Sequence, residues 1–422
     1  VTDSLIEVAQ AVVDVPSDVV EQKVGEYISW LKDKHHEAIK IAVSDEAAAG
    51  DVTAEVDRLI EKLRVTLLGV GYLEDISPKS MDYILSFGER LCMNVVSGAI
   101  TSLGLKSNAY TGFEAGLITD SSYGRARPLF TRIGDSVNEK LKPVLDEGVI
   151  PVVSGFIAAN EEGHITTLGR GGSDYTASLL GAALSVDEVQ IWTDVDGILS
   201  CDPRIVSDAR LIDTLSYAEA LDLGYFGAKV IHSKMIEPAM ECDVAVRVKN
   251  TFNPSGEGTL IVSRQQKADK VVKAVALARE VVIINLSGVG MVETPNIAGK
   301  VFSTLGDANI NVIMISGSSE SNLSFVVNKK DAKAAVDLLA EEINREIVEG
   351  LSLIEDVAIV CMVGAGMAGA KGIAAKIFTH VSEADVNIIM IAQGSSEVNI
   401  AFIVLGSDAD KTVKTLHDKF IT

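Results

Sequence analysis

The sequence lacks any excess of basic residues, and this excludes a large class of partners. Its 422 residues include 59 Asp and Glu against 37 Lys and Arg, a formal net charge of −22. A strongly acidic chain repels the phosphates of nucleic acids and anionic membrane surfaces. We therefore predict no nucleic-acid partner and no membrane partner. Any anionic ligand must be held by a few local basic side chains.

Cysteine and long apolar runs are also scarce. The four cysteines are widely spaced and form no CxxC pair, which predicts neither a disulfide framework nor a zinc site and indicates a reduced, cytoplasmic protein. The longest apolar run, residues 357–370, is too short and too glycine-rich to span a bilayer. No signal peptide is visible at Val1.

The most informative stretch is residues 166–176, TTLGRGGSDYT. Its three glycines allow a tight turn and the close approach of a ligand. Ser173 is a good N-cap, so a helix is expected to begin there with its free N–H groups facing the turn. Arg170 can bind a carboxylate or phosphate with two hydrogen bonds. We interpret the stretch as an anion-binding loop; an ordinary glycine turn before a helix is the alternative.

Helices are predicted before this loop. Residues 1–72 carry apolar residues at helical spacing, and a further helix is expected to start at Ser77-Pro78, with serine as cap and proline in the first turn. On its apolar face Glu89 follows a glycine, which is costly unless the carboxylate has a partner. Glu89 is therefore a candidate to bind an ammonium group; a salt bridge to Arg90 or to another basic residue is the alternative.

Two apolar segments flank the anion-binding loop. Residues 149–156 and 189–192 are predicted as strands buried on both faces, with the loop and its helix between them. Parallel sheets of this kind bind ligands at the carboxyl ends of their strands. This places Thr193 and Asp194 at the same rim as the loop.

Two further basic residues are expected near that rim. Arg204 follows in an Asp-Pro-Arg turn, and Lys229 lies two residues beyond Gly227. Either residue alone would be interpreted as an ordinary solvent-exposed side chain. Together with Arg170 they predict a polyphosphate ligand.

The C-terminal part contains an internal repeat. Residues 290–322 recur as residues 366–399, so that NVIMI at 311–315 is matched by NIIMI at 387–391. Each copy is predicted to follow the ferredoxin-like βαββαβ order. Neither carries a plausible catalytic nucleophile or acid–base couple, which favours a ligand-sensing pair; a purely structural duplication is the alternative.

These motifs resemble those of the aspartate kinases (aspartokinases), in the family's order and over nearly the whole chain. They are residues 86–89 (SFGE), 167–174 (TLGRGGSD), 192–195 (WTDV), 202–204 (DPR) and 227–232 (GAKVIH). The resemblance implies an α/β fold: a three-layer amino-acid-kinase domain with a mainly parallel sheet, followed by two ACT repeats. The implied boundaries are 1–264 for the kinase domain, 270–350 for the first repeat and 351–422 for the second, with 270–280 free to pair with the second repeat.

The resemblance also implies an activity. It is ATP-dependent phosphorylation of the β-carboxylate of L-aspartate, the first step toward lysine, threonine and methionine, with Mg²⁺ carried by the ATP phosphates and water. Arg170 would bind the α-carboxylate of aspartate, Glu89 its ammonium group, and Asp174 would orient the catalytic lysines. The remaining substrate-binding candidates are Thr2, Gly171, Gly172 and Ser173. The nucleotide-binding candidates are Thr193, Asp194, Arg204 and Lys229.

Paired ACT repeats imply an effector amino acid and a homo-oligomer formed through the repeats. Threonine is the preferred effector and lysine the alternative. The loop after residue 391 is one residue longer than its counterpart in the first repeat and contains Gln393, whose amide can both donate and accept. The effector-binding candidates are Gln393, Asn387, Ile388, Asn399 and Asn311.

Two features depart from the family pattern. Leu199 replaces the usual tyrosine of the nucleotide loop, and the family's Lys-Phe-Gly-Gly-Thr-Ser strand does not occur, so we expect further residues before Val1 in the functional protein. Two other functions stay open. One is a kinase of the same fold acting on glutamate, acetylglutamate or carbamate; the other is a non-catalytic amino-acid sensor.

Overall fold

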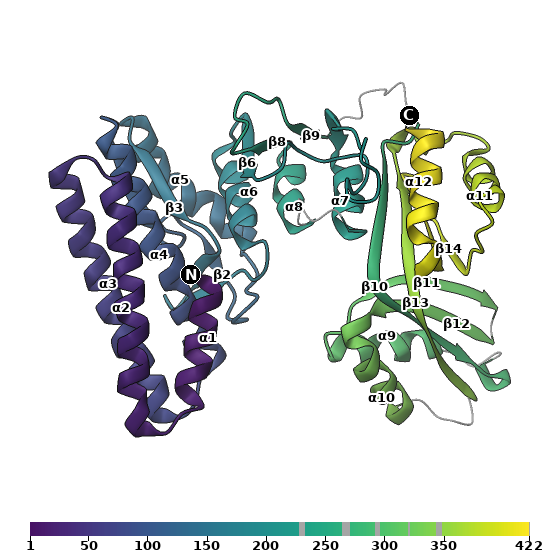
Figure 1. The fold of residues 1–422 in the computed structure, drawn as a ribbon, viewed down its shortest axis with the longest axis horizontal. Coiled ribbons are helices and arrows are strands. Elements are labelled where there is room, and N and C mark those ends of the chain that lie inside the picture. The colour runs from purple at the N-terminus through teal and green to yellow at the C-terminus, as the bar shows by residue number, and fades with distance from the viewer. Residues whose placement is uncertain (228–232, 264–270, 292–295, 320, 343–347, 422) are drawn as a thin grey trace. The chain divides into compact units, whose positions relative to one another are not determined.

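The computed structural model describes residues 1–227, 233–263, 271–291, 296–319, 321–342 and 348–421 (Figure 1). The chain forms two compact units. The first unit consists of Val1–Val189 and Lys234–Val244, and the second of Gln190–Ser233 and Ala245–Thr422. Among the described residues, no helix combines the length and the apolarity that crossing a membrane requires.

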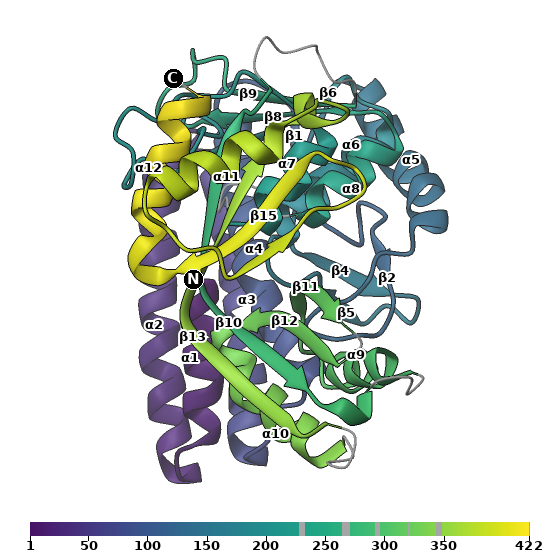
Figure 2. The same ribbon diagram turned by 90° about the vertical axis from the view of Figure 1, so that its right-hand side faces the viewer.

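Four helices open the first unit: α1 (Thr2–Val13), α2 (Ser17–Ala42), α3 (Glu46–Leu73) and α4 (Pro78–Ser102). Their apolar faces share one core, in which Leu31 and Leu63 are fully buried, and α1, α2 and α3 lie side by side (Figure 2). The hydroxyl of Ser77 accepts the N–H of Ser80, and Pro78 occupies the first turn of α4. The helices predicted for residues 1–72 and the start predicted at Ser77-Pro78 are confirmed.

The first unit continues with β1 (Ser107–Thr111), β2 (Ile118–Thr119), α5 (Phe130–Asp146), β3 (Ile150–Ser154), β4 (Ile157–Asn160), β5 (Ile165–Thr167), α6 (Gly172–Leu184) and α8 (Ser233–Glu241). Strand β3 pairs in parallel with β1, while β4 and β5 form an antiparallel hairpin. The strand expected at 149–156 was therefore wrong in two respects. Ile150 is 40% exposed, and the chain turns at Phe156, which adopts a positive φ of 67°.

The second unit begins with β6 (Glu188–Thr193), β7 (Thr214–Ser216), α7 (Tyr217–Tyr225), β8 (Ala245–Asn250) and β9 (Thr259–Val262). The sheet order is β6-β8-β9-β7, with β7–β9 parallel and β8–β9 antiparallel. Strand β6 buries Val189 and Ile191 but exposes 46% of Trp192, so it is covered on one face and not on both. The α/β class is confirmed, but the sheets are mixed and the expected mainly parallel sheet is met only in part.

The rest of the second unit contains the repeat: β10 (Ala274–Ser287), α9 (Ile297–Asp307), β11 (Val312–Ser319), β12 (Asn322–Asn328) and α10 (Ala332–Glu342), then β13 (Gly350–Val363), α11 (Ile373–Glu383), β14 (Met390–Ala392), β15 (Asn399–Leu405) and α12 (Ala409–Phe420). All six strands form one antiparallel sheet in the order β11-β12-β10-β13-β15-β14. Each repeat follows the order strand, helix, strand, strand, helix, which confirms the first five elements of the predicted βαββαβ order. The sixth strand was wrong for the second repeat, because α12 is the last element that the structure describes.

The long strand β10 belongs to the cores of both repeats. Val275, near its start, packs in the cluster that contains Phe402 of the second repeat. Ile284, near its end, packs in the cluster that contains Phe325 of the first repeat. Figure 1 shows β10 and β13 running together along this part of the molecule, as their shared register requires.

Candidate active site

The first unit contains a cavity of about 620 Å³. Its wall is formed by the start of α1, the middle of α4, Gly124, the end of β5 and the glycine turn that leads into α6. The polar and charged side chains in this wall are Thr2, Asp3, Asp82, Glu89, Thr167, Arg170, Ser173 and Asp174. Segments separated by more than 80 residues in the sequence thus supply one site.

The glycine turn differs from the prediction in where its helix begins. Gly171 adopts a left-handed conformation (φ 72°) and is the N-cap of α6, so Ser173 lies within the first turn and does not cap the helix. The predicted cap was wrong because glycine enters this conformation without the steric penalty of a Cβ, which turns the chain into the helix earlier. Gly172 is also required for close packing, since an added Cβ would lie 3.0 Å from the ring of Phe156.

Glu89 lies on the cavity face of α4. Burial raises the pKa of its carboxyl above the ordinary value of 4.5. The ion pairs of the described residues do not include one between Glu89 and Arg90, whose guanidinium lies 4.7 Å from the ring centre of Phe87. The neighbouring Gly88 faces the side chain of Thr2, so that the start of α1 can approach α4 closely.

Arg170 and Asp174 are two further charged residues of the wall. Arg170 is exposed at the tip of the turn, between the two left-handed glycines 169 and 171. Asp174 is half-buried in the first turn of α6. A cationic guanidinium and an anionic carboxylate, Arg170 and Glu89, therefore line the same cavity. Such an arrangement suits a ligand that carries both an anionic and a cationic group.

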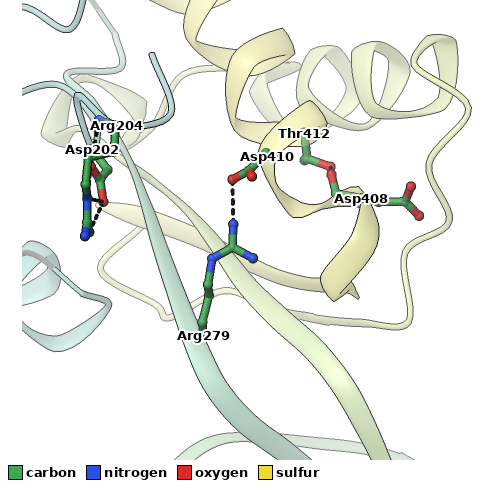
Figure 3. A network of polar contacts seen from close by, with 6 residues as sticks. All are labelled: Asp202, Arg204, Arg279, Asp408, Asp410 and Thr412. Carbon is green, nitrogen blue, oxygen red and sulfur yellow. Dashed lines mark hydrogen bonds and ion pairs between the residues drawn. The ribbon is translucent and has the colours of Figure 1, made fainter. Parts of the chain in front are cut away.

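The second unit contains three of the four predicted nucleotide-binding residues. Thr193 ends β6, and its hydroxyl donates to Asp194 at 3.2 Å. The guanidinium of Arg204 is held by Asp202 through bonds of 2.6 to 3.1 Å, on a side chain that is 78% exposed (Figure 3). Lys229 lies outside the residues that the structure describes.

Comparisons with known proteins identify the family to which this chain is related. The model of the Amino acid kinase family matches residues 21–250, and the model of the ACT domain matches residues 284–343 and 360–420. The aspartate kinase of Pseudomonas fluorescens is 34% identical over 352 residues, which cover 81% of this chain and 82% of that protein. This chain belongs to the aspartate kinase family.

Other relatives differ in how much of them the chain covers. The bifunctional aspartokinase/homoserine dehydrogenase of Haemophilus influenzae is 43% identical over 273 residues, or 64% of this chain, but the match spans only 34% of that protein. Among solved structures, E. coli aspartokinase III in complex with aspartate and ADP has a TM-score of 0.81 at 28% identity, covering 99% of this chain and 91% of that one. The same enzyme in complex with lysine and aspartate has a TM-score of 0.79 at 28% identity and the same coverage.

The effector candidates of this aspartate kinase family member fall into two groups. Gln393 and Asn387 are exposed beside β14, and Ile388 is half-buried against the core of the second repeat. Asn399 and Asn311 instead hydrogen-bond to helix α7, through Asp222 and Tyr225 respectively. The tyrosine hydroxyl also donates to the carbonyl of Ile313 at 3.1 Å.

Sequence reasoning missed two buried carboxylates in this family member. Asp82 lines the cavity and is 1% exposed. Glu219 is fully buried where it caps α7, and it accepts hydrogen bonds from Lys273 and from the backbone N–H of Ala365. For Asp82 a signal was available: it precedes Glu89 by seven residues, two helical turns, and so shares its face of α4.

Proposed function

We propose that this chain transfers the γ-phosphoryl group of ATP to the β-carboxylate of L-aspartate and gives 4-phospho-L-aspartate, a first step toward lysine, threonine and methionine. The observation that carries the proposal is the cavity in which Glu89 and Arg170 face one space. L-Aspartate carries an ammonium group and an α-carboxylate, which match these two side chains in charge. Its β-carboxylate is then left to react.

Each candidate residue takes one role. Arg170 binds the α-carboxylate with two hydrogen bonds, and Glu89 binds the ammonium group. Asp174, in the first turn of α6, orients the catalytic lysines. Thr2, Gly171, Gly172 and Ser173 complete the substrate contacts. Holding the two reactants in place supplies much of the rate enhancement in phosphoryl transfer, because no covalent enzyme intermediate is needed.

ATP is proposed to lie against Thr193, Asp194 and Arg204, with Lys229 on its phosphates. In the described ranges no group of three or more His, Cys, Asp or Glu side chains is placed to hold a metal ion. Mg²⁺ would be carried by the ATP phosphates and water, and it would supply neutralisation of their negative charge.

The two repeats are proposed to regulate the kinase. An end-product amino acid binds near Gln393 and favours a less active state, and the repeats also join copies of the chain. Threonine is our preferred effector; lysine is the alternative, supported by the lysine complex of the E. coli relative. We retain the division into a kinase domain (1–264) and two ACT repeats (270–350 and 351–422) as part of this proposal.

A coupled ADP-release assay tests the activity. Purified chain with ATP and Mg²⁺ should release ADP when L-aspartate is added, and a hydroxylamine trap should capture the acyl phosphate. Glutamate, acetylglutamate and carbamate should give little release. Release that is fastest with one of those acceptors would reassign the substrate. Binding of an amino acid without any ADP release would favour a sensor.

A further inference from the structure

Asp82 is a buried carboxylate with an unusual set of partners. It is 1% exposed, and both of its oxygens accept the backbone N–H of Gly124, at 2.9 and 3.1 Å. Thr167 donates twice more, through its N–H at 2.9 Å and its hydroxyl at 2.7 Å. All of these donors are neutral. Burying a charge against neutral donors is expensive, so such a group persists where it holds something in place.

The partners belong to the segments that build the cavity. Thr167 is the last residue of β5, two residues before the glycine turn that presents Arg170. Gly124 lies in the loop that also bonds to β5 through Ala126 N–H and the Thr167 carbonyl, at 2.8 Å. An added Cβ on Gly169 would lie 3.1 Å from the carbonyl oxygen of Gly124. One carboxylate thus joins α4, this loop and the strand that enters the turn.

We propose that Asp82 is a positioning residue for substrate binding, which sets the separation between Glu89 on α4 and Arg170 on the glycine turn. This rests on the proposed function. Asp82 acts through the backbone of β5 and α4 and not through a bond to the substrate. The ammonium group and the α-carboxylate of the substrate must be bound at a fixed spacing. A displacement of the bound substrate by about 1 Å is enough to lower the reaction rate about 100-fold.

The test compares four single variants. Asp82→Asn keeps the shape but places an amide N–H₂ against donors that need an acceptor, so it should raise the KM for aspartate by about 10- to 100-fold and leave the KM for ATP within about twofold. Thr167→Val removes one bond and should give an intermediate rise. Thr167→Ser keeps the bond and should resemble the parent. Glu114→Gln is the matched control, since Glu114 accepts the N–H and hydroxyl of Thr111 in the same way but away from the cavity.

A double-mutant cycle separates positioning from general stability. In an Arg170→Ala background, Asp82→Asn should have little further effect on kcat/KM for aspartate, because the group it positions is gone. Equal losses in both backgrounds would overturn the proposal, as would an unchanged aspartate KM in Asp82→Asn or a parallel rise in the ATP KM. If Asp82→Asn does not fold, the Thr167→Val and Thr167→Ser pair carries the same comparison.

Calorimetric binding of L-aspartate distinguishes this proposal from the proposed function. A parent that binds aspartate without releasing ADP would refute the kinase activity, while the dissociation constants of the variants would still test Asp82. A parent that turns over aspartate while the Asp82 and Thr167 variants match it would refute the positioning role alone. A parent that does not bind aspartate would refute both.

Discussion

Removing one partner of the Lys273–Glu219 ion pair should destabilise the protein far more than removing one partner of the other ion pair made from the same strand region. Lys273 precedes β10, and its ammonium lies 2.9 Å from Glu219 Oε2, with the two side chains 11% and 0% exposed. Arg279, within β10, lies 2.5 Å from Asp410 of α12, with 46% and 56% exposure (Figure 3). The two pairs differ mainly in access to water.

The expected magnitudes follow from this difference. Lys273→Met leaves the Glu219 carboxylate buried with only neutral donors, from Ser216 and Ala365. Stranding a buried charge in this way costs about 3–5 kcal/mol. Arg279→Met breaks a pair that water already screens and should cost about 0–1 kcal/mol. Replacing both partners, Lys273→Met with Glu219→Gln, should restore part of the loss because no buried charge is left.

Denaturant unfolding can isolate the second unit. The sequence has two tryptophans, so a Trp30→Phe background leaves Trp192 of β6 as the single reporter. Lys249 lies 5.1 Å from the centre of that ring, and loss of this contact should change the emission on unfolding. A chain with two units need not unfold in one step, so only the transition seen by Trp192 is compared. Equal midpoint shifts for Lys273→Met and Arg279→Met would refute the reasoning.

Three further predictions concern function. Arg170→Ala should raise the KM for aspartate about 10- to 100-fold and spare that for ATP, since a charged hydrogen bond is worth about 1.5–3 kcal/mol; initial rates that show the reverse would reassign Arg170. Burial raises the pKa of Glu89, and only the ionised carboxylate binds an ammonium group. As the pH falls, the aspartate KM should therefore begin to rise at a higher pH than it would if this glutamate were exposed. Glu89→Gln should flatten that profile. Gln393→Ala should weaken inhibition in threonine and lysine titrations without changing the uninhibited kcat; identical inhibition curves would exclude Gln393 from the effector site.

The elements that the sequence predicted well are those encoded by local patterns. The N-terminal helices show apolar residues at helical spacing, and Ser77-Pro78 marks the start of α4. The internal repeat could be recognised because residues 290–322 and 366–399 contain similar residues in the same order. The strands were predicted less well. Runs such as residues 149–156 contain enough apolar residues for a two-sided strand, but the exposure of β3 and the hairpin that follows depend on what packs against them.

The buried carboxylates were missed because their partners are far away in the sequence. Asp82 is 85 residues from Thr167, and Glu219 is 54 residues from Lys273 and 146 from Ala365. Exposed and buried acidic residues are the same residue types in the sequence, and only the tertiary fold determines which of them are buried away from water. The sequence nevertheless contains one indication of this burial: the acidic residue Asp82 interrupts an apolar helical face between Met81 and Ile84. Because burying a carboxylate without partners is unfavourable, an acid on such a face implies donors elsewhere in the chain. The same argument that singled out Glu89 therefore applies to Asp82, with backbone and hydroxyl donors in place of a ligand.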